Sequence, residues 1–487
     1  MQQQILRRVQ RVIDQGPYTD TWQSLCTHPV PKWYADAKFG LFIHWGVYSV
    51  PAFGNEWYSR NMYLKGSKAY EHHIKTYGSQ ERFGYKDFIP MFTAEKFDPA
   101  AWMELAAESG AKYVMPVSEH HDGFQMYRSA LSRWNAAEMG PCRDVLGELR
   151  AEAEKRGLAF CTSNHRAEHC WFFSGGMSFP SDVPGNPDFY GRPIPMGSDT
   201  RSLNDIYSPV PPEEHLENWL ARVCELVEAY RPRVVYFDWW VKNVAFRPYL
   251  RKFAAFYYNL AQQWGEEVAI NDKYGAFMAG SAVRDVERGY MSGIQPDMWQ
   301  TCTSVAKNSW GYTEHNEFKR AEDLTADLVD IVSKNGNMLL NIGPRADGTI
   351  TDEETRVLRA IGAWLRRNGE GIYGTRPWAR YGEGAAKTPE GSFCEGERPA
   401  FTAEDFRYTA KPGAVYAFCM NPPADGVLRL KAFARNYGDA TDYHVTGVRT
   451  MDGANAPFTR DETCMTVRCN PAAWQKGYPA CIRVELD

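Results

Sequence analysis

Short apolar runs alternate with segments of helical periodicity from residue 33 to about residue 370. The runs are continuous, which is typical of strands buried on both faces of a sheet. Between them, apolar side chains recur every three or four positions, as at Leu216, Leu220 and Val223. Repetition of strand and then helix predicts parallel strands joined by right-handed crossovers. The clearest runs are 39–46, 113–117, 158–163, 234–237, 268–273 and 337–343.

Two weaker runs, 284–290 and 299–304, raise the number of predicted strands to eight. Eight strands favour an α/β fold of the (β/α)8 or TIM-barrel type over an open doubly wound sheet. Neither GxGxxG nor GxxxxGK[ST] follows any of the runs, which argues against a nucleotide-binding fold. We therefore predict a catalytic barrel over residues 33–376, preceded by a helical lead-in over 1–32 that packs outside it.

The pattern changes after the barrel. Short strand-like runs separated by Gly, Pro, Asn and Asp predict a C-terminal all-β sandwich over residues 377–487. Within the barrel region, the stretch 174–212 is rich in Gly, Pro and Ser and too long for a plain connection, so it predicts a loop over a functional face. The predicted C-terminal strands are 407–411, 414–420, 427–431, 443–451, 465–468 and 481–486.

Composition narrows the classes of function. A net charge of -5 leaves no basic stripe for phosphates, so no nucleic-acid partner is expected. No apolar run approaches the roughly 18 residues of a membrane span, so no membrane partner is expected either. Aromatic residues make up 14% of the chain, which fits either large aromatic cores or platforms for sugar rings. The oligomeric state leaves no mark on the sequence.

The eleven cysteines are scattered and mostly lie in apolar segments, which fits reduced, buried thiols better than a disulfide framework. The N-terminal residues include arginines but no apolar core after them, so they do not resemble a signal peptide. Both observations predict a cytoplasmic protein. A secreted protein whose signal had been removed would have the same sequence.

Polar residues follow the predicted strands at their C-terminal ends, where a barrel carries its chemistry. Asp238 is the most informative, because an acid directly after a buried strand is costly unless it is paired or functional. One histidine at such an end would most simply be a hydrogen-bonded core residue, but four of them with an aspartate favour a site. The strand-end residues are His44, Trp45, Glu119, His120, His121, Asp122, Asn164, His165, Asp238, Asn271, Asp272, Lys273 and Asn341.

Two chemistries fit these residues. A metal-bound hydroxide could be held by His44, His120 or His121, His165 and Asp238, but no HxH or HExxH spacing is present. Glycoside hydrolysis needs two carboxylates, an apolar platform and polar groups for hydroxyls. The residues favour the second chemistry, with Asp238 as one carboxylate, and they do not identify the other.

Five longer motifs resemble the α-L-fucosidases of glycoside hydrolase family 29, in the order in which that family has them. The resemblance implies a TIM barrel with a C-terminal β-domain and a retaining mechanism with an Asp nucleophile and a Glu acid/base. The motifs are WYADAKFGLFIHWG at 33–46, NEWY at 55–58, SEHHDGF at 118–124, SWGY at 309–312 and NMLLNIGPRADG at 337–348.

By this resemblance Asp238 is the nucleophile, although Trp239 and Trp240 follow it where the family usually has glycine. Glu287 matches the acid/base best, whereas Glu267 and Glu314 lie on the wrong sides of the relevant strand and motif. Lys273 stands where an arginine is common. The residues implied in sugar binding are His44, Glu56, Trp57, His120, His121 and Trp310, with Asn164, His165 and Lys273 as further candidates.

We therefore predict an exo-acting retaining α-L-fucosidase that hydrolyses terminal α-L-fucosyl residues of glycans or glycoconjugates without a metal or organic cofactor. A retaining glycosidase for a fucose-like sugar, such as an α-L-galactoside, is the main alternative. A metal-dependent hydrolase and a non-catalytic carbohydrate-binding protein are the alternatives from other classes.

Overall fold

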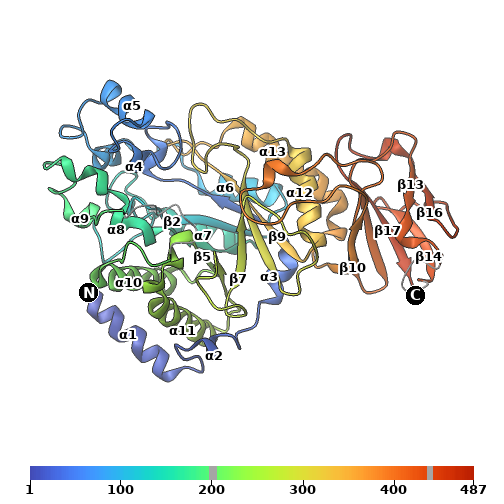
Figure 1. Ribbon diagram of the computed structural model, residues 1–487, viewed down its shortest axis with the longest axis horizontal. Coiled ribbons are helices and arrows are strands. Elements are labelled where there is room, and N and C mark those ends of the chain that lie inside the picture. The colour runs from blue at the N-terminus through green and yellow to red at the C-terminus, as the bar shows by residue number, and fades with distance from the viewer. Residues whose placement is uncertain (197–205, 436–442) are drawn as a thin grey trace.

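Eight parallel strands form a closed barrel, and two antiparallel sheets follow it at the far end of the molecule (Figure 1). The computed structural model describes residues 1–196, 206–435 and 443–487. Strand order is β1-β9-β8-β7-β6-β5-β4-β2, and pairing of β1 with β2 closes the barrel. The strands are β1 (Phe39–Ile43), β2 (Tyr113–Glu119), β4 (Thr162–Asn164), β5 (Val234–Phe237), β6 (Ala269–Asp272), β7 (Val283–Glu287), β8 (Trp299–Ser304) and β9 (Gly336–Ile342).

All eight predicted barrel strands are present, and the predicted barrel with a C-terminal β-domain is confirmed. The run predicted at 158–163 is interrupted: β3 (Ala159–Phe160) and β4 flank Cys161, and both pair with β2. The continuous apolar runs are buried on both faces, as the pattern indicated. In β5, Val234 and Tyr236 lie in the barrel interior, whereas Val235 and Phe237 join the layer between strands and helices.

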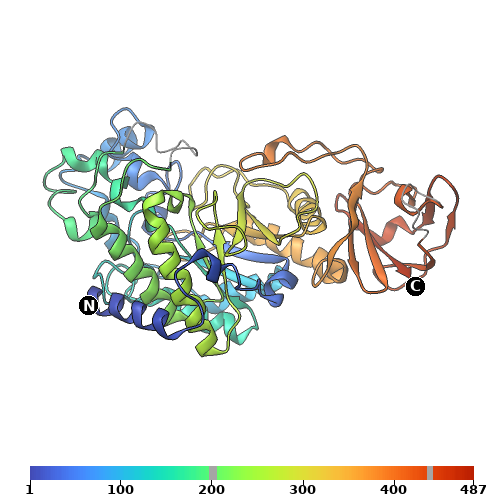
Figure 2. The ribbon, with the colours of Figure 1, turned by 60° about the horizontal axis from the view of Figure 1, so that its bottom comes forward.

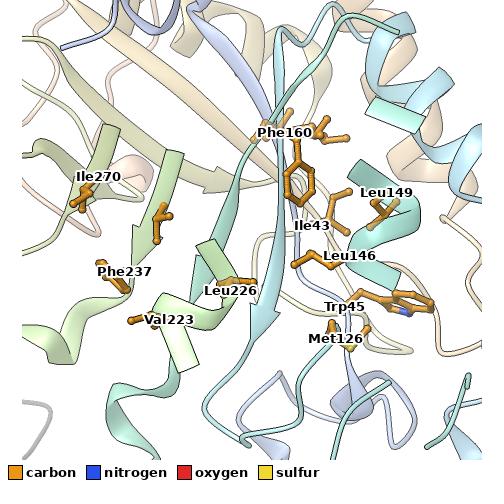
Figure 3. Packing of buried hydrophobic residues seen from close by; sticks show 14 of the residues in the cluster. Ile43, Trp45, Met126, Leu146, Leu149, Phe160, Val223, Leu226, Phe237 and Ile270 are labelled. Atoms are coloured by element: carbon orange, nitrogen blue, oxygen red, sulfur yellow. The ribbon is translucent and has the colours of Figure 1, made fainter. Parts of the chain in front are cut away.

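Helices cover most of the barrel, and their apolar faces pack against the outward side chains of the strands. Figure 3 shows this layer, with Phe237 near Val223 of the covering helix α10. Burying each such side chain contributes about 1.5–3 kcal/mol. The main covering helices are α6 (Pro99–Glu108), α7 (Val145–Lys155), α10 (Glu213–Tyr230), α11 (Arg247–Trp264), α12 (Ala321–Ser333) and α13 (Asp352–Asn368).

Short helices lie in the connections between the barrel elements. Helix α1 (Gln2–Gln15) lies outside the barrel against α10 and α11 (Figure 2). Its Val9, Val12 and Ile13 are buried there. None of the helices in the described ranges is long and apolar enough to cross a membrane. The short helices are α2 (Trp22–Leu25), α3 (Lys32–Ala37), α4 (Tyr58–Asn61), α5 (Lys68–Thr76), α8 (His169–Phe172) and α9 (Pro187–Tyr190).

The predicted alternation of strand and helix is wrong at one place. In the described chain, β6, β7 and β8 follow one another without a helix between them. The connections 273–282 and 288–298 are at the lower limit for a crossover with its helix, which needs at least about 10–12 residues. This side of the barrel is covered by loops, and a later part of the chain reaches it.

The C-terminal domain is a sandwich of a five-stranded and a three-stranded sheet. Alternate side chains of β12 attach this domain to the barrel. Val415 and Ala417 enter the sandwich core, whereas Tyr416 and Phe418 join the core of the barrel. A buried ion pair of Asp330 in α12 with Arg407 in β11 also ties the domains together. The strands are β10 (Arg376–Glu383), β11 (Phe406–Lys411), β12 (Ala414–Cys419), β13 (Val427–Leu430), β14 (Val445–Thr450), β15 (Phe458–Arg460), β16 (Met465–Arg468) and β17 (Ala480–Leu486).

Candidate active site

A cavity of about 690 Å³ opens at the C-terminal ends of the barrel strands. It brings together every residue predicted to act in catalysis or sugar binding except Asn164, whose Oδ1 accepts a hydrogen bond from the Arg166 amide beside the cavity. The other polar strand-end residues do not line it: Glu119, Asp122, Asn271, Asp272 and Asn341. Glu267 and Glu314, the rejected acid/base candidates, do not line it. The lining residues are Phe42, His44, Asn55, Glu56, Trp57, Arg60, Asn61, Leu64, His120, His121, His165, Met196, Tyr236, Asp238, Trp239, Lys273, Tyr274, Glu287, Trp310 and Phe393.

Two carboxylates face one ammonium group in this cavity. Nζ of Lys273 lies 3.1 Å from Oδ1 of Asp238 and 2.6 Å from Oε2 of Glu287. The separation between Oδ1 of Asp238 and Oε2 of Glu287 therefore cannot exceed the sum of these two distances. That limit is shorter than the roughly 6.5–9.5 Å between the carboxyl groups of inverting glycosidases and compatible with the roughly 5–5.5 Å of retaining ones.

The surroundings of Asp238 keep it ionised. Burial alone would raise the pKa of this carboxyl, but Lys273, His165 and His121 together hold it well below its usual value. Nδ1 of His165 lies 3.1 Å from Oδ2 of Asp238, and Nε2 of His121 lies 3.6 Å from the same oxygen. Asp238 directly follows β5, so the strand itself aims the carboxylate at the cavity.

The pKa of Glu287 is shifted in the direction opposite to that of Asp238. Burial raises the pKa of its carboxyl above the usual value, and the negative charge of Asp238 adds to the shift, while Lys273 opposes it. Glu287 is the last residue of β7. Two neighbouring carboxyls with pKa values shifted in opposite directions are the arrangement that assigns one to the anionic role and the other to the proton-donating role.

Three histidines line the adjoining wall. Nδ1 of His44 donates to Oδ1 of Asn341 at 2.7 Å, which leaves Nε2 of His44 as an acceptor. Burial lowers the pKa of His44 and of His120 well below the usual value, so both are neutral. The His120 ring stacks on that of His165 at 4.9 Å, and its buried Nδ1 has no hydrogen-bond partner within the described ranges.

His121 is charged near neutral pH. Burial would lower its pKa, but Glu168 and Asp238 raise it to about 9. Its Nδ1 lies 3.1 Å from Oε2 of the fully buried Glu168. His120 and His121 both reach the cavity because β2 has already ended at Glu119, so the opposite orientation of neighbours on a strand does not apply.

Glu56 and the tryptophans shape the remaining wall. The carboxylate of Glu56 accepts hydrogen bonds from the Trp310 amide at 2.9 Å and from the Ser309 hydroxyl at 3.1 Å. Glu56 thereby holds the loop that presents the Trp310 ring, which lies 5.2 Å from the His44 ring. Trp57 makes an edge contact with His121 at 5.2 Å.

Residues 5–370 match the model of the α-L-fucosidase family. The chain belongs to this family. The tissue α-L-fucosidase of Rattus norvegicus is 33% identical over 424 residues, which cover 85% of this chain and 81% of that protein. The plasma α-L-fucosidase of Homo sapiens is 33% identical over 431 residues, with 85% and 81% covered. The structure of Thermotoga maritima α-fucosidase in complex with a mechanism-based inhibitor matches with a TM-score of 0.76 and 28% identity, covering 96% of this chain and all of that one.

Family membership confirms the resemblance drawn from the five motifs. It makes the protein a glycoside hydrolase of the α-L-fucosidase type, and it sets aside the metal-dependent hydrolase and the non-catalytic binding protein as alternatives. The structure of the Thermotoga maritima relative holds a mechanism-based inhibitor, which fits the retaining chemistry predicted for the family. The roles of single residues stay predictions.

In this fucosidase-family chain the two tryptophans after Asp238 have different positions. Trp239 lines the cavity and carries Nζ of Lys242 5.3 Å from its ring centroid. Trp240 is buried in the core, where it packs edge-on against Trp171 at 5.7 Å. Only Trp239 therefore replaces the usual small residue at the cavity.

Several cavity residues were missed by sequence reasoning. Asn55 and Arg60 lie in or just after the NEWY motif, so the motif itself could have indicated them. Met196 belongs to the predicted loop 174–212, of which residues 197–205 lie outside the described ranges. Phe393 in the cavity and Glu168, the partner of His121, had no signal, because neither lies near a recognised motif. Others that were missed are Phe42, Asn61, Leu64, Tyr236 and Tyr274.

Among the residues that the structure describes, two groups of side chains have the spacing to hold a metal ion: His44, His120 and His165, and His121, His165 and Asp238. Both include His165, whose two ring nitrogens already bond to Ser163 and Asp238. Lys273 supplies positive charge 3.1 Å from Asp238, where a cation would be repelled. The donors therefore suit sugar hydroxyls better than a resident metal ion.

Proposed function

We propose that this protein removes terminal α-L-fucosyl residues from glycans or glycoconjugates by double displacement, with Asp238 as nucleophile and Glu287 as acid/base. The observation that carries the proposal is the pair of carboxylates joined by the ammonium of Lys273. Their oppositely shifted pKa values support the division of roles. Family membership supports α-L-fucosyl as the transferred group.

In the first step a carboxylate oxygen of Asp238 forms a bond to the anomeric carbon, and the bond from that carbon to the leaving oxygen breaks. Glu287 gives its proton to the leaving oxygen, so the alcohol departs neutral. In the second step Glu287 takes a proton from water, whose oxygen attacks the same carbon and releases Asp238 as a carboxylate. Two inversions retain the configuration.

The histidines and tryptophans suit the transferred sugar. Neutral His44 offers its Nε2 as an acceptor to a hydroxyl group, neutral His120 offers its other ring nitrogen, Nε2, and charged His121 offers a donor. Trp310 presents an apolar ring to the cavity, where the C5-methyl group of fucose would pack. An α-L-galactoside carries a hydroxymethyl group at that carbon, which an apolar surface disfavours.

The test is pre-steady-state hydrolysis of an activated aryl α-L-fucoside. We expect a burst of aryl alcohol equal to the enzyme concentration, because the covalent fucosyl-enzyme then hydrolyses more slowly. We also expect kcat/KM to be bell-shaped in pH, falling as Asp238 becomes protonated at acid pH and as Glu287 loses its proton above its usual range. No turnover, or equal turnover of the matching α-L-galactoside, would contradict the proposed substrate.

We also propose that the protein works in a reducing compartment such as the cytoplasm. All eleven cysteines are free in the structure, and most of them are buried. Thiol titration of unfolded protein purified without reductant should count eleven free thiols. A smaller count with disulfide-linked peptides would contradict this proposal.

A further inference from the structure

The chain that follows the barrel returns to the catalytic face. Residues 391–395, here called the strap, lie between β10 and β11 and run along the end of β7. This is the side of the barrel where no helix follows the strands in the described chain. Three backbone amides of the strap donate to carbonyls there: Gly391 to Tyr290 at 3.0 Å, Phe393 to Glu287 at 2.7 Å and Glu395 to Arg288 at 3.0 Å.

The strap is held by close backbone contact and by partly buried ion pairs. A Cβ atom at Gly289 would lie 1.8 Å from the carbonyl oxygen of Gly391, so the two backbones touch where only glycine fits. The carboxylate of Glu395 lies 2.9 Å from Nη1 of Arg288 and 2.7 Å from Nζ of Lys319. These contacts keep the strap in one place relative to Glu287.

Phe393 has two costly features that folding does not explain. Its side chain is 57% exposed, and it lines the catalytic cavity. Its backbone has a φ of 59°, which is sterically disfavoured for a bulky residue. Tyr274 and Arg288, which follow Lys273 and Glu287, also have positive φ, so three of the nine such non-glycine residues in the described ranges lie here. Backbone strain gathered around reacting groups points to function.

Three of the aromatic residues that line the cavity come from the loops around the two carboxylates: Trp239 after β5, Tyr274 after β6 and Phe393 in the strap. The acid/base residue must lie beside the leaving oxygen, because it protonates that atom. The Phe393 amide donates to the Glu287 carbonyl, and Tyr274 follows Lys273, whose ammonium contacts the Glu287 carboxylate. Nζ of Lys242 lies 5.3 Å from the Trp239 ring and 6.0 Å from the Tyr274 ring, so those two rings are neighbours. The three residues therefore lie on the side of the cavity from which the leaving group departs. Aromatic faces bind flat apolar surfaces, and a pyranose offers such a surface through its axial C–H groups.

We propose that Phe393, with Tyr274 and Trp239, forms the binding site for the leaving group, and that this site takes a pyranose ring through its apolar face. The inference rests on the proposed function, since only a Glu287 acid/base places the leaving group at these rings. It makes a segment outside the barrel part of the catalytic site, and Phe393 a residue that determines specificity.

The experiment compares Phe393→Ala with the unsubstituted enzyme on three α-L-fucosyl substrates, through kcat/KM, which reports the departure of the leaving group. Fucosyl fluoride has no leaving ring and needs little acid assistance. A dinitrophenyl fucoside has a ring and needs little assistance. A fucosyl disaccharide has a ring and needs a proton. We expect about a tenfold loss on the last two and less than about a twofold change on fluoride.

Each other outcome overturns the proposal. A loss on the disaccharide alone would mean that Phe393 only positions Glu287. An equal loss on all three substrates would mean that the substitution disturbs the whole active site. No loss would mean that the Phe393 ring does not bind the leaving group. If the unsubstituted enzyme does not hydrolyse fucosyl fluoride, the proposed function itself has failed, which is a separate result.

Two further variants sharpen the comparison. Phe393→Tyr keeps the ring and should stay within about twofold of the unsubstituted enzyme on all three substrates. Met278→Ala removes another exposed apolar side chain, 50% exposed, that does not line the cavity, and it should change none of the three values. Loss of activity in either variant on the ring-bearing substrates would contradict a specific role for Phe393.

Discussion

The two halves of the barrel support their carboxylates in different ways. Asp238 ends a strand that is covered by α10 and α11, where Phe237 packs against Trp219 at 5.2 Å and Phe253 at 5.0 Å. Glu287 ends a strand that no helix follows in the described chain, and the strap covers it instead. A regular strand-and-helix unit aims the nucleophile by local structure, whereas the acid/base depends on residues far along the chain.

The largest effect should come from Asp238→Ala. Removing the attacking carboxylate should lower kcat/KM on every fucoside by on the order of 10⁵-fold. The measurement is steady-state hydrolysis of an activated aryl fucoside and of fucosyl fluoride. Asp272→Asn is the matched control, because Asp272 ends the neighbouring strand but lines a different cavity. Substantial turnover by the Asp238 variant would remove the nucleophile assignment.

Glu287→Ala should cost about 10²–10⁴-fold on a disaccharide and much less on a dinitrophenyl fucoside, because only the disaccharide needs the proton. Azide should restore turnover of the activated substrate by attacking the fucosyl-enzyme, with an α-fucosyl azide as product. Glu314→Ala, outside the cavity, is the control. Unchanged activity on the disaccharide would place the acid/base elsewhere.

Gly289→Ala tests whether the acid/base half depends on the strap. The added Cβ meets the backbone oxygen of Gly391, so the strap must move, and a displacement of about 1 Å at a catalytic group can cost on the order of 10²-fold. We expect that loss on the disaccharide, with the burst on an activated substrate retained. Gly293→Ala, where nothing lies within 4 Å of the new atom, should behave as the unsubstituted enzyme. Equal behaviour of both variants would contradict the comparison.

The smallest expected effect is on the positive charge of His121, which helps to keep Asp238 ionised. In Glu168→Gln, His121 loses the carboxylate that raises its pKa to about 9, so that pKa should fall and His121 should be neutral at a lower pH. Asp238 then loses part of the positive charge that lowers its own pKa, so the acid limb of kcat/KM should move to higher pH. NMR titration of the imidazole and the pH profile measure both. Glu225→Gln, which bonds to Ser129, should move neither.

The same contrast explains which parts of the site could be predicted. His44, Asp238 and Lys273 directly follow buried strands, and a barrel brings strand ends together whatever the loops do. Glu287 ends a strand with a weaker signal, because the second residue of β7, Arg284, is exposed and no amphipathic helix follows to mark the strand's end. It was identified by resemblance alone.

Asn164 shows the limit of the strand-end argument. It ends β4, as predicted, but the next residue, His165, is the one that enters the cavity. A shift of one residue exchanges the two faces of a strand, and sequence patterns do not locate a strand end to one residue. Glu168 and Phe393 were missed for a different reason, since their contacts join segments that no periodic pattern relates.

The sequence by itself determined the barrel, the sandwich and the strand that carries Asp238, because burial on both faces of a strand and on one stripe of a helix leaves periodic apolar patterns. The tertiary structure decided which residues face the cavity, the opposite pKa shifts of Asp238 and Glu287, and the return of the strap to β7. These depend on desolvation and on backbone contacts between segments far apart in the chain. Neither desolvation nor such long-range contacts leave a local pattern in the sequence.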